Sequence, residues 1–119
     1  RDQKRALSLY YDLLALKEAP MRILYLMNRQ FRILLDLTSM QKAGLDAKTM
    51  ASKAGIPPFA VRRSLEQAAR FQEKELIQAL NDGASLETDS KTGKITDQIA
   101  VELLIVTYSK QPASPASVL

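Results

Sequence analysis

The chain has 119 residues, a length that suits one domain with a single core. It carries a formal net charge of +4 and contains neither cysteine nor histidine, which excludes disulfides, a thiolate nucleophile, a cysteine–histidine zinc site and an imidazole base. No apolar run approaches the roughly 20 residues that cross a bilayer, so no membrane contact is expected. Because the sequence begins at Arg1 without an initiator methionine, we expect a fragment of a longer protein.

Apolar residues recur three and four positions apart almost throughout the chain. This spacing is typical of α-helices and predicts an all-α fold, a single bundle of five or six helices. Residues 1–109 would form this domain, and the proline-, alanine- and serine-rich residues 110–119 a disordered tail. Helices are expected at about residues 3–17, 20–43, 46–54, 58–70, 73–88 and 96–109.

The helix at 20–43 is expected to be central, because its apolar residues sweep an arc of roughly 200°, wider than a surface helix needs. The last helix is apolar on most sides and should also be well buried. In the helix at 73–88, Gly83 should weaken the middle by about 1 kcal/mol relative to alanine. The residues of that helix expected to face inward are Leu76, Ile77, Leu80, Ala84 and Leu86.

A polar, basic strip remains on the helix at 20–43. Arg22, Tyr25, Arg29 and Arg32 lie along it at helical spacing. Arginine and tyrosine are enriched in subunit interfaces, and arginines can also follow a nucleic-acid backbone. The strip therefore predicts a subunit interface or a nucleic-acid contact, with a merely solvated face as an equal alternative.

Residues 49–65 have the layout of a helix-turn-helix, with a turn at Gly55 and an apolar anchor at Val61. Arg62 and Arg63 would then contact phosphates or base edges. Two prolines at the start of the second helix count against this, because they remove backbone amides that bind phosphate. A DNA-binding module of a transcription regulator is the alternative function. Further candidates for a DNA or subunit contact are Arg70, Lys91 and Lys94.

No catalytic site or cofactor is predicted for the chain. The segment around Gly93 lacks the first glycine of a phosphate loop and the hydroxyl that follows its lysine. The carboxylate pairs Glu73 with Glu75 and Glu87 with Asp89 have no neighbour in sequence that would tune them for acid–base chemistry.

Several stretches together resemble one known family, the C-terminal domain of the delta subunit of the bacterial DNA polymerase III clamp loader. The resemblance covers about residues 2–108, although Ala54 stands where that family usually has leucine. The stretches are Pro20 to Leu24, Arg29 to Leu34, the turn Ala51 to Val61, the helix Leu65 to Phe71, the loop Lys91-Thr92-Gly93 and Ala100 to Leu104.

The resemblance implies a helical collar domain in a subunit that helps to place the sliding clamp on primed DNA during replication. In that family this domain joins delta prime and the ATPase gamma/tau subunits of the DNA polymerase III holoenzyme, a DNA-directed DNA polymerase. The clamp-binding wedge belongs to AAA+-like N-terminal domains, so the sliding clamp would be reached only through parts absent from this chain. Primer–template DNA is a further expected partner, and the bacterial cytoplasm the expected location.

Overall fold

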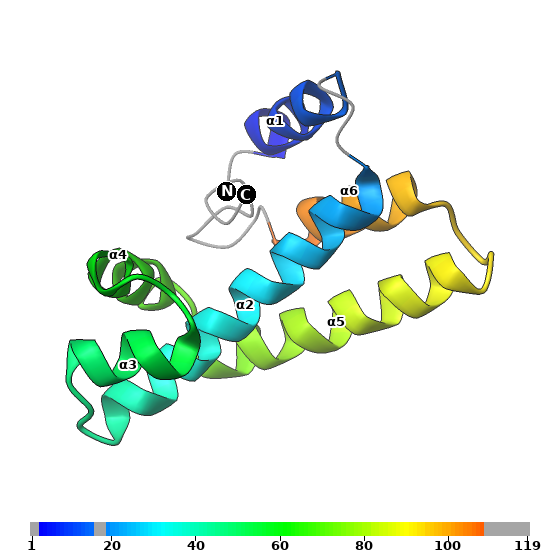
Figure 1. The fold of residues 1–119 in the computed structure, drawn as a ribbon. Helices are drawn as coiled ribbons and strands as arrows, with labels where there is room; N and C mark the ends of the chain where they lie inside the picture. Colours follow the sequence, from blue (N-terminus) through cyan, green and yellow to red (C-terminus); the bar gives the residue numbers. More distant parts are fainter. Residues whose placement is uncertain (1–2, 16–18, 109–119) are drawn as a thin grey trace.

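The computed structural model describes residues 3–15 and 19–108 (Figure 1). This part of the chain is all-helical, which confirms the predicted fold class. The expected tail at 110–119 and the expected end of the first helix, near residue 17, lie outside the described residues. The helices are α1 (Gln3–Ala15), α2 (Pro20–Lys42), α3 (Ala47–Ala54), α4 (Pro58–Ala68), α5 (Glu73–Lys91) and α6 (Asp97–Tyr108).

α2 is the central helix, as its wide apolar arc predicts. It contacts α3, α4, α5 and α6, while α1 packs on α6. α2 and α5 are the two longest helices and lie side by side (Figure 1). α3 and α4 cover the C-terminal half of α2, and α6 lies beside its N-terminal half. The surface between α2 and α5 is therefore the longest helix–helix seam of the described bundle.

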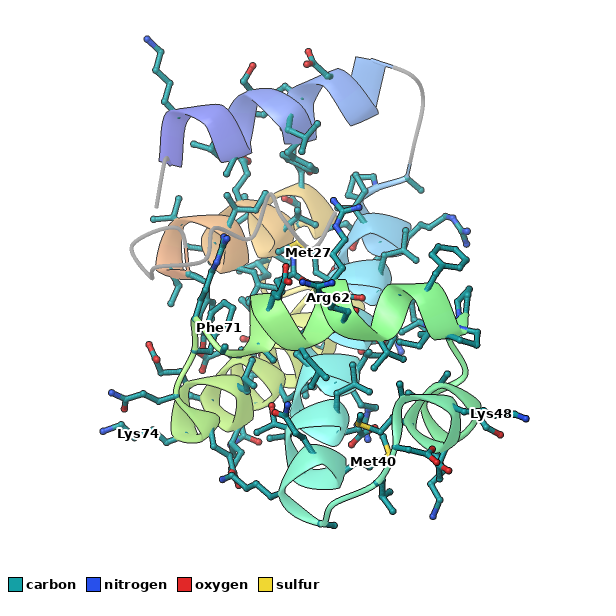
Figure 2. All side chains as sticks on the ribbon, turned by 90° about the vertical axis from the view of Figure 1, so that its left-hand side faces the viewer. Met27, Met40, Lys48, Arg62, Phe71 and Lys74 are labelled. Atoms are coloured by element: carbon teal, nitrogen blue, oxygen red, sulfur yellow. The ribbon has the colours of Figure 1, made fainter. Side chains whose placement is uncertain are left out.

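Two groups of buried side chains form the core. The first joins α1, α2, α5 and α6 around an aromatic cluster in which Phe31 meets Phe71 edge-on at 6.1 Å and lies 5.6 Å from Tyr108, between ring centroids. The second lies between the C-terminal half of α2, α3 and α4, and includes Leu37 and Val61. Figure 2 shows Met40 beside this second group, between α2 and α3.

Local chemistry sets the helix ends much as the sequence indicates. Gly44, with φ of 81°, and Gly55, with φ of 71°, adopt the left-handed conformation just after α2 and at the end of α3. The carboxylate of Asp46 accepts a hydrogen bond of 2.7 Å from the backbone N–H of Thr49 and so caps α3. At the start of α5, the Glu75 side chain accepts a 2.7 Å hydrogen bond from the backbone N–H of Gln72.

α5 differs from the expectation in length. It continues to Lys91, so residues 89–91, expected in a loop, belong to the helix. Gly93, with φ of 82°, ends this helix, because it lets the N–H of Lys94 turn back to the carbonyl of Asp89 at 2.9 Å.

The inward face of α5 was also predicted only in part. Leu76 is buried as expected, but Ile77 is 45% exposed and Ala84 is exposed, while Leu80 and Leu86 are half-buried. The side of α5 that packs on α2 instead carries Leu76, Ala79 and Gly83. A Cβ on Gly83 would lie 1.9 Å from Oδ1 of Asn28, so the missing side chain is what admits Asn28 between the helices. A side chain at position 83 would therefore require the Asn28 amide to move.

α6 is less completely buried than its composition predicts. Ala100, Val101, Leu104, Ile105 and Tyr108 face the core. Ile99 and Leu103, one helical turn apart, are each 45% exposed. A helix in a small bundle has too few neighbours to cover all of its sides, so this apolar strip stays at the surface.

Candidate functional site

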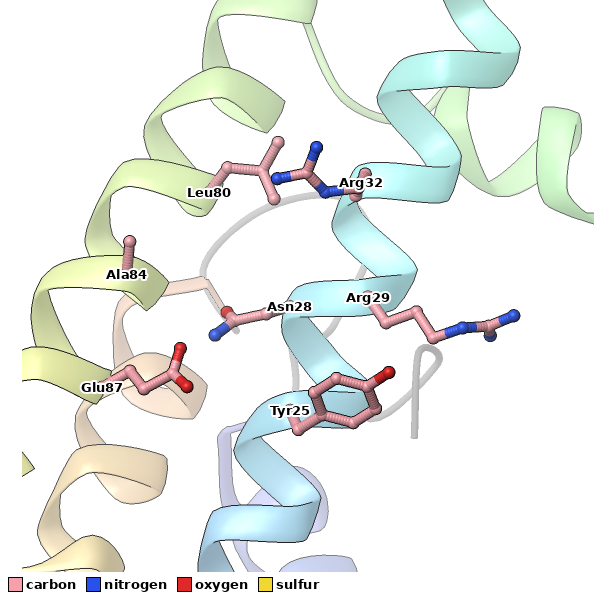
Figure 3. Close-up of a pocket in the computed structure, with 7 residues that line it drawn as sticks. All are labelled: Tyr25, Asn28, Arg29, Arg32, Leu80, Ala84 and Glu87. Carbon is pink, nitrogen blue, oxygen red and sulfur yellow. The ribbon is translucent and has the colours of Figure 1, made fainter. Parts of the chain in front are cut away.

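A cleft lies between α2 and α5 (Figure 3). Its volume is about 390 Å³. It brings together three of the four strip residues that the sequence singled out on the second helix, Tyr25, Arg29 and Arg32. Arg22 lies one turn earlier on α2, exposed, and does not line the cleft. The complete lining is Tyr25, Asn28, Arg29, Arg32, Leu80, Ala84 and Glu87.

The periodicity of the two helices builds this cleft. Tyr25, Asn28, Arg29 and Arg32 are spaced so that they share one side of α2. Leu80, Ala84 and Glu87 form the facing wall on α5 by the same rule. Figure 3 shows Asn28 pointing across from α2 toward α5. Its Oδ1 is buried beside Gly83 of α5 and has no hydrogen-bond partner among the described residues.

The charges at the cleft are unevenly matched. Glu87 forms an ion pair of 3.2 Å with Lys91, one turn further along α5, which brings the predicted Lys91 to the edge of the cleft. Arg29 and Arg32 are exposed, and neither forms an ion pair with a carboxylate in the described part of the chain. Lys94 lies in the exposed turn after α5 and does not line the cleft. The α2 wall therefore presents two available guanidinium groups.

The remaining predicted basic residues belong to a different surface, on α4 and the turn that follows it. Arg62, Arg63 and Arg70 are exposed, and Arg62 pairs with Glu66 at 3.3 Å. Figure 2 shows Arg62 on the outer side of α4. Apart from Arg22 and Lys94, the predicted site residues thus divide into two groups, one at the α2–α5 cleft and one on α4 and the turn that follows it.

Phe59, in the first turn of α4, was missed by the sequence analysis. Its side chain is 85% exposed, the highest value among the exposed large hydrophobic residues of the described chain. The spacing of the apolar residues could have predicted this exposure. Val61 and Ala68 face the core, and helical geometry places Phe59 on the opposite side of α4. Pro57 and Pro58 start α4 and hold the aromatic ring outward on a stiff turn.

The titratable groups with shifted pKa values lie away from the α2–α5 cleft. Burial, followed by the hydrogen bond that Tyr108 donates to Asp82 at 2.6 Å, raises the pKa of Tyr108. Burial, with the nearby charge of Glu102, raises the pKa of Tyr10 to about 12. A hydrogen bond donated to Glu102 raises the pKa of Tyr11. The pKa shifts of Tyr10 and Tyr108 therefore reflect burial between helices, whereas that of Tyr11 reflects an exposed hydrogen bond from α1 to α6.

No group of three or more metal-ligating side chains occurs within the described residues. In the same part of the chain, no helix is both long and apolar enough to cross a membrane.

Fold and site together define a class: a small all-helical domain with an exposed groove that offers guanidinium, phenol, amide and apolar groups for non-covalent contact. The sequence profile described as "DNA polymerase III delta subunit, C-terminal domain" matches residues 1–108. The chain therefore belongs to the family of C-terminal domains of the DNA polymerase III delta subunit.

Two relatives agree with this assignment. The chain is 32% identical over 111 residues to DNA polymerase III subunit delta of Bacillus subtilis, a match that covers 93% of this chain and 32% of that protein. Its fold is similar to that of the Bacillus subtilis DNA clamp loader delta protein YqeN, with a TM-score of 0.80, 33% identity and coverage of 89% of this chain and 32% of that one. The chain thus spans about a third of the length of these relatives.

The alternative of a transcription-regulator helix-turn-helix is not supported by these comparisons. The helices themselves exist, as α3 and α4 with Gly55 at the turn. Their pairing buries Met50, Ala51 and Val61 against α2, so the motif serves the second core group. The same helix–turn–helix spacing arises wherever two short helices cross on a third, which is why the sequence pattern alone was ambiguous.

Proposed function

We propose that the chain is a non-catalytic assembly domain of a bacterial clamp-loader delta subunit, acting in DNA replication in the cytoplasm. Its partners would be delta prime and the gamma/tau subunits, with the sliding clamp engaged by other parts of the full-length protein. The family match over residues 1–108 supports this proposal. The similarity in fold to YqeN, which is described as a DNA clamp loader delta protein, also supports it.

One observation carries the proposal at the level of residues. Tyr25 is 58% exposed and shares a groove with Arg29 and Arg32. Tyrosine and arginine are the residue types over-represented at the energetic centres of protein interfaces. A guanidinium that forms no ion pair within the described residues, next to an exposed aromatic ring, suits a surface completed by another subunit. We therefore assign Tyr25, Arg29 and Arg32 to the subunit interface, and propose that Arg22, exposed one turn earlier on α2, extends it.

Size-exclusion chromatography of the full-length subunit with delta prime and gamma/tau tests this function. Co-elution as one complex is expected for the wild type. Arg29→Glu should weaken it, because the reversal places a like charge against the acidic partner group that an arginine site selects. Arg63→Glu, a charge reversal on the α4 surface, is the matched control and should leave assembly unchanged. Failure of the folded wild-type subunit to co-elute would contradict the proposal.

A second candidate function is contact between the outer side of α4 and primer–template DNA. Arg63 and Arg70 are exposed and form no ion pair with a described carboxylate, and the Phe59 ring is free to stack on a base. If this surface binds phosphates, the logarithm of affinity should fall with the logarithm of salt concentration, and Arg63→Ala should reduce that slope by about 1. An affinity insensitive to salt would exclude this contact.

A further inference from the structure

The two walls of the α2–α5 cleft differ in chemistry. The α2 wall carries Tyr25 and the exposed guanidinium groups of Arg29 and Arg32. The α5 wall carries Leu80 and Ala84, and Ile77 extends the same apolar row by one turn while remaining 45% exposed. A partner that fills this cleft must therefore be apolar on one side and acidic on the other.

The geometry favours a helix as the occupant. Glu87 lies ten positions after Ile77 on α5, which corresponds to about 15 Å, or nearly three helical turns. The small side chain of Ala84 in this row allows a neighbouring backbone to approach closely. An amphipathic helix laid in a groove matches such a surface, since its anchors recur every three to four residues.

Charge decides which side chains the partner must supply. Glu87 is the carboxylate that lines the cleft, and Lys91 already pairs with it at 3.2 Å. Arg29 and Arg32 lack such a partner within the described residues. A nucleic-acid strand is a poor occupant, because its phosphates would lie against Glu87 and an apolar row. Carboxylates from another protein would meet both guanidinium groups with charge-assisted hydrogen bonds.

We propose that the α2–α5 cleft receives an amphipathic helix of a neighbouring clamp-loader subunit. Asp or Glu side chains of that helix face Arg29 and Arg32, and its apolar row packs on Ile77, Leu80 and Ala84. This inference rests on the proposed function, which it deepens by stating the chemistry of the partner segment.

Site-directed photo-crosslinking in the complete clamp loader tests the proposal. A benzophenone amino acid replaces Tyr25 in one variant of the full-length subunit. In a second variant of the same subunit, it replaces Phe59 on α4. After irradiation of the purified complex, the crosslinked peptides are identified by mass spectrometry. The Tyr25 position should crosslink to one neighbouring subunit, in a helical segment with an Asp or Glu within one turn of the crosslinked residue.

Two substitutions on α5 test the apolar wall. Ala84→Arg fills the groove with a long side chain and should weaken assembly about tenfold or more, the loss typical of disrupting an interface anchor. Ser85→Arg, at the next position, is the matched control, because Ser85 is exposed and borders α6 instead. It should change the apparent Kd less than twofold. Arginine is a good helix former, so neither change should unfold α5.

The outcomes separate this inference from the function on which it rests. If the complex assembles but Tyr25 crosslinks to the same subunit, to DNA or to nothing, the cleft is not the docking site and the assembly function still stands. Equal effects of Ala84→Arg and Ser85→Arg would likewise overturn the inference. If the wild-type complex does not assemble, the proposed function and the inference both fail.

Discussion

At the scale of single residues, the Asn28 side chain of α2 occupies the space that a side chain on Gly83 of α5 would need. A Cβ at position 83 would lie 1.9 Å from Oδ1 and 2.7 Å from Cγ of Asn28. Gly83→Ala should therefore lower the free energy of unfolding, because overpacking costs about 1–3 kcal/mol and exceeds the gain of about 1 kcal/mol in helix propensity. In an Asn28→Ala background the same change should become stabilising. Urea unfolding of the four proteins measures this coupling.

The decisive result of this comparison is whether the effect of Gly83→Ala on the free energy of unfolding changes sign when Asn28 is replaced by alanine. If Gly83→Ala were equally destabilising with and without Asn28, the clash would involve another atom and the account of the seam would be wrong.

Tyr108 links α6 to α5 and makes stability depend on alkaline pH. Its pKa is raised in the folded state, so the stability it contributes is complete below the unfolded value near 10 and is lost as pH rises above 10. Tyr108→Phe should lower the free energy of unfolding at pH 7 by about 1 kcal/mol, through the lost hydrogen bond to Asp82, and make the alkaline decline shallower. Denaturant unfolding between pH 7 and pH 11 tests both effects.

Tyr25→Phe, at an exposed tyrosine of the cleft, is the control for this experiment. An identical alkaline decline in wild type and Tyr108→Phe would show that Tyr108 is not a source of the pH dependence.

At the scale of elements, α3 depends on its cap, because a helix of eight residues gains little from propensity alone. Asp46→Ala should lower Tm at pH 7, and Asp46→Asn, which keeps an accepting oxygen but loses the charge, should lower it less. The hydrogen bond from Thr49 lowers the pKa of Asp46. The stability it contributes is therefore present above the unfolded pKa and is lost as pH falls through the folded value.

Thermal unfolding of the three proteins at pH 7 and at pH 3 provides the measurement. The gap in Tm between the wild type and Asp46→Ala should narrow at the lower pH. A gap that does not depend on pH would point to a cap that works without the charge.

At the scale of the whole molecule, α2 passes through both core groups and should make them unfold together. Leu104→Ala in the first group should cost about 2–5 kcal/mol, and Val61→Ala in the second about 2 kcal/mol. Two of the four tyrosines, Tyr10 and Tyr108, belong to the first group and none belongs to the second. Because the chain has no tryptophan, the change in tyrosine fluorescence on unfolding reports on the surroundings of the first group and not on the second.

Far-UV circular dichroism reports on all helices at once, so the two probes can be compared. Val61→Ala should shift the urea midpoints of both probes equally. A circular dichroism transition that precedes an unchanged tyrosine transition would show that α3 and α4 unfold as a separate unit.

Features that depend on interactions between residues close in the sequence could be predicted, whereas features that depend on contacts between distant helices could not. Helix positions, the central place of α2 and the Gly55 turn were predictable, because apolar periodicity and turn-forming residues act within a few residues. The strip with Tyr25, Arg29 and Arg32 was likewise visible from helical spacing alone.

Only the tertiary structure decided which side of each helix meets which neighbour. The sequence predicts that Ile77 and Ala84 face inward. In the structure, however, the side of α5 that carries Ala79 and Gly83 faces α2. The physical reason is that the contact between two helices depends on the shapes of both surfaces. Here the Asn28 amide of α2 occupies the space left by the missing side chain of Gly83 on α5. The sequence by itself determined an all-helical domain of the delta-subunit family with a basic, aromatic strip, whereas the packing of α5 on α2 turned that strip into one wall of a cleft.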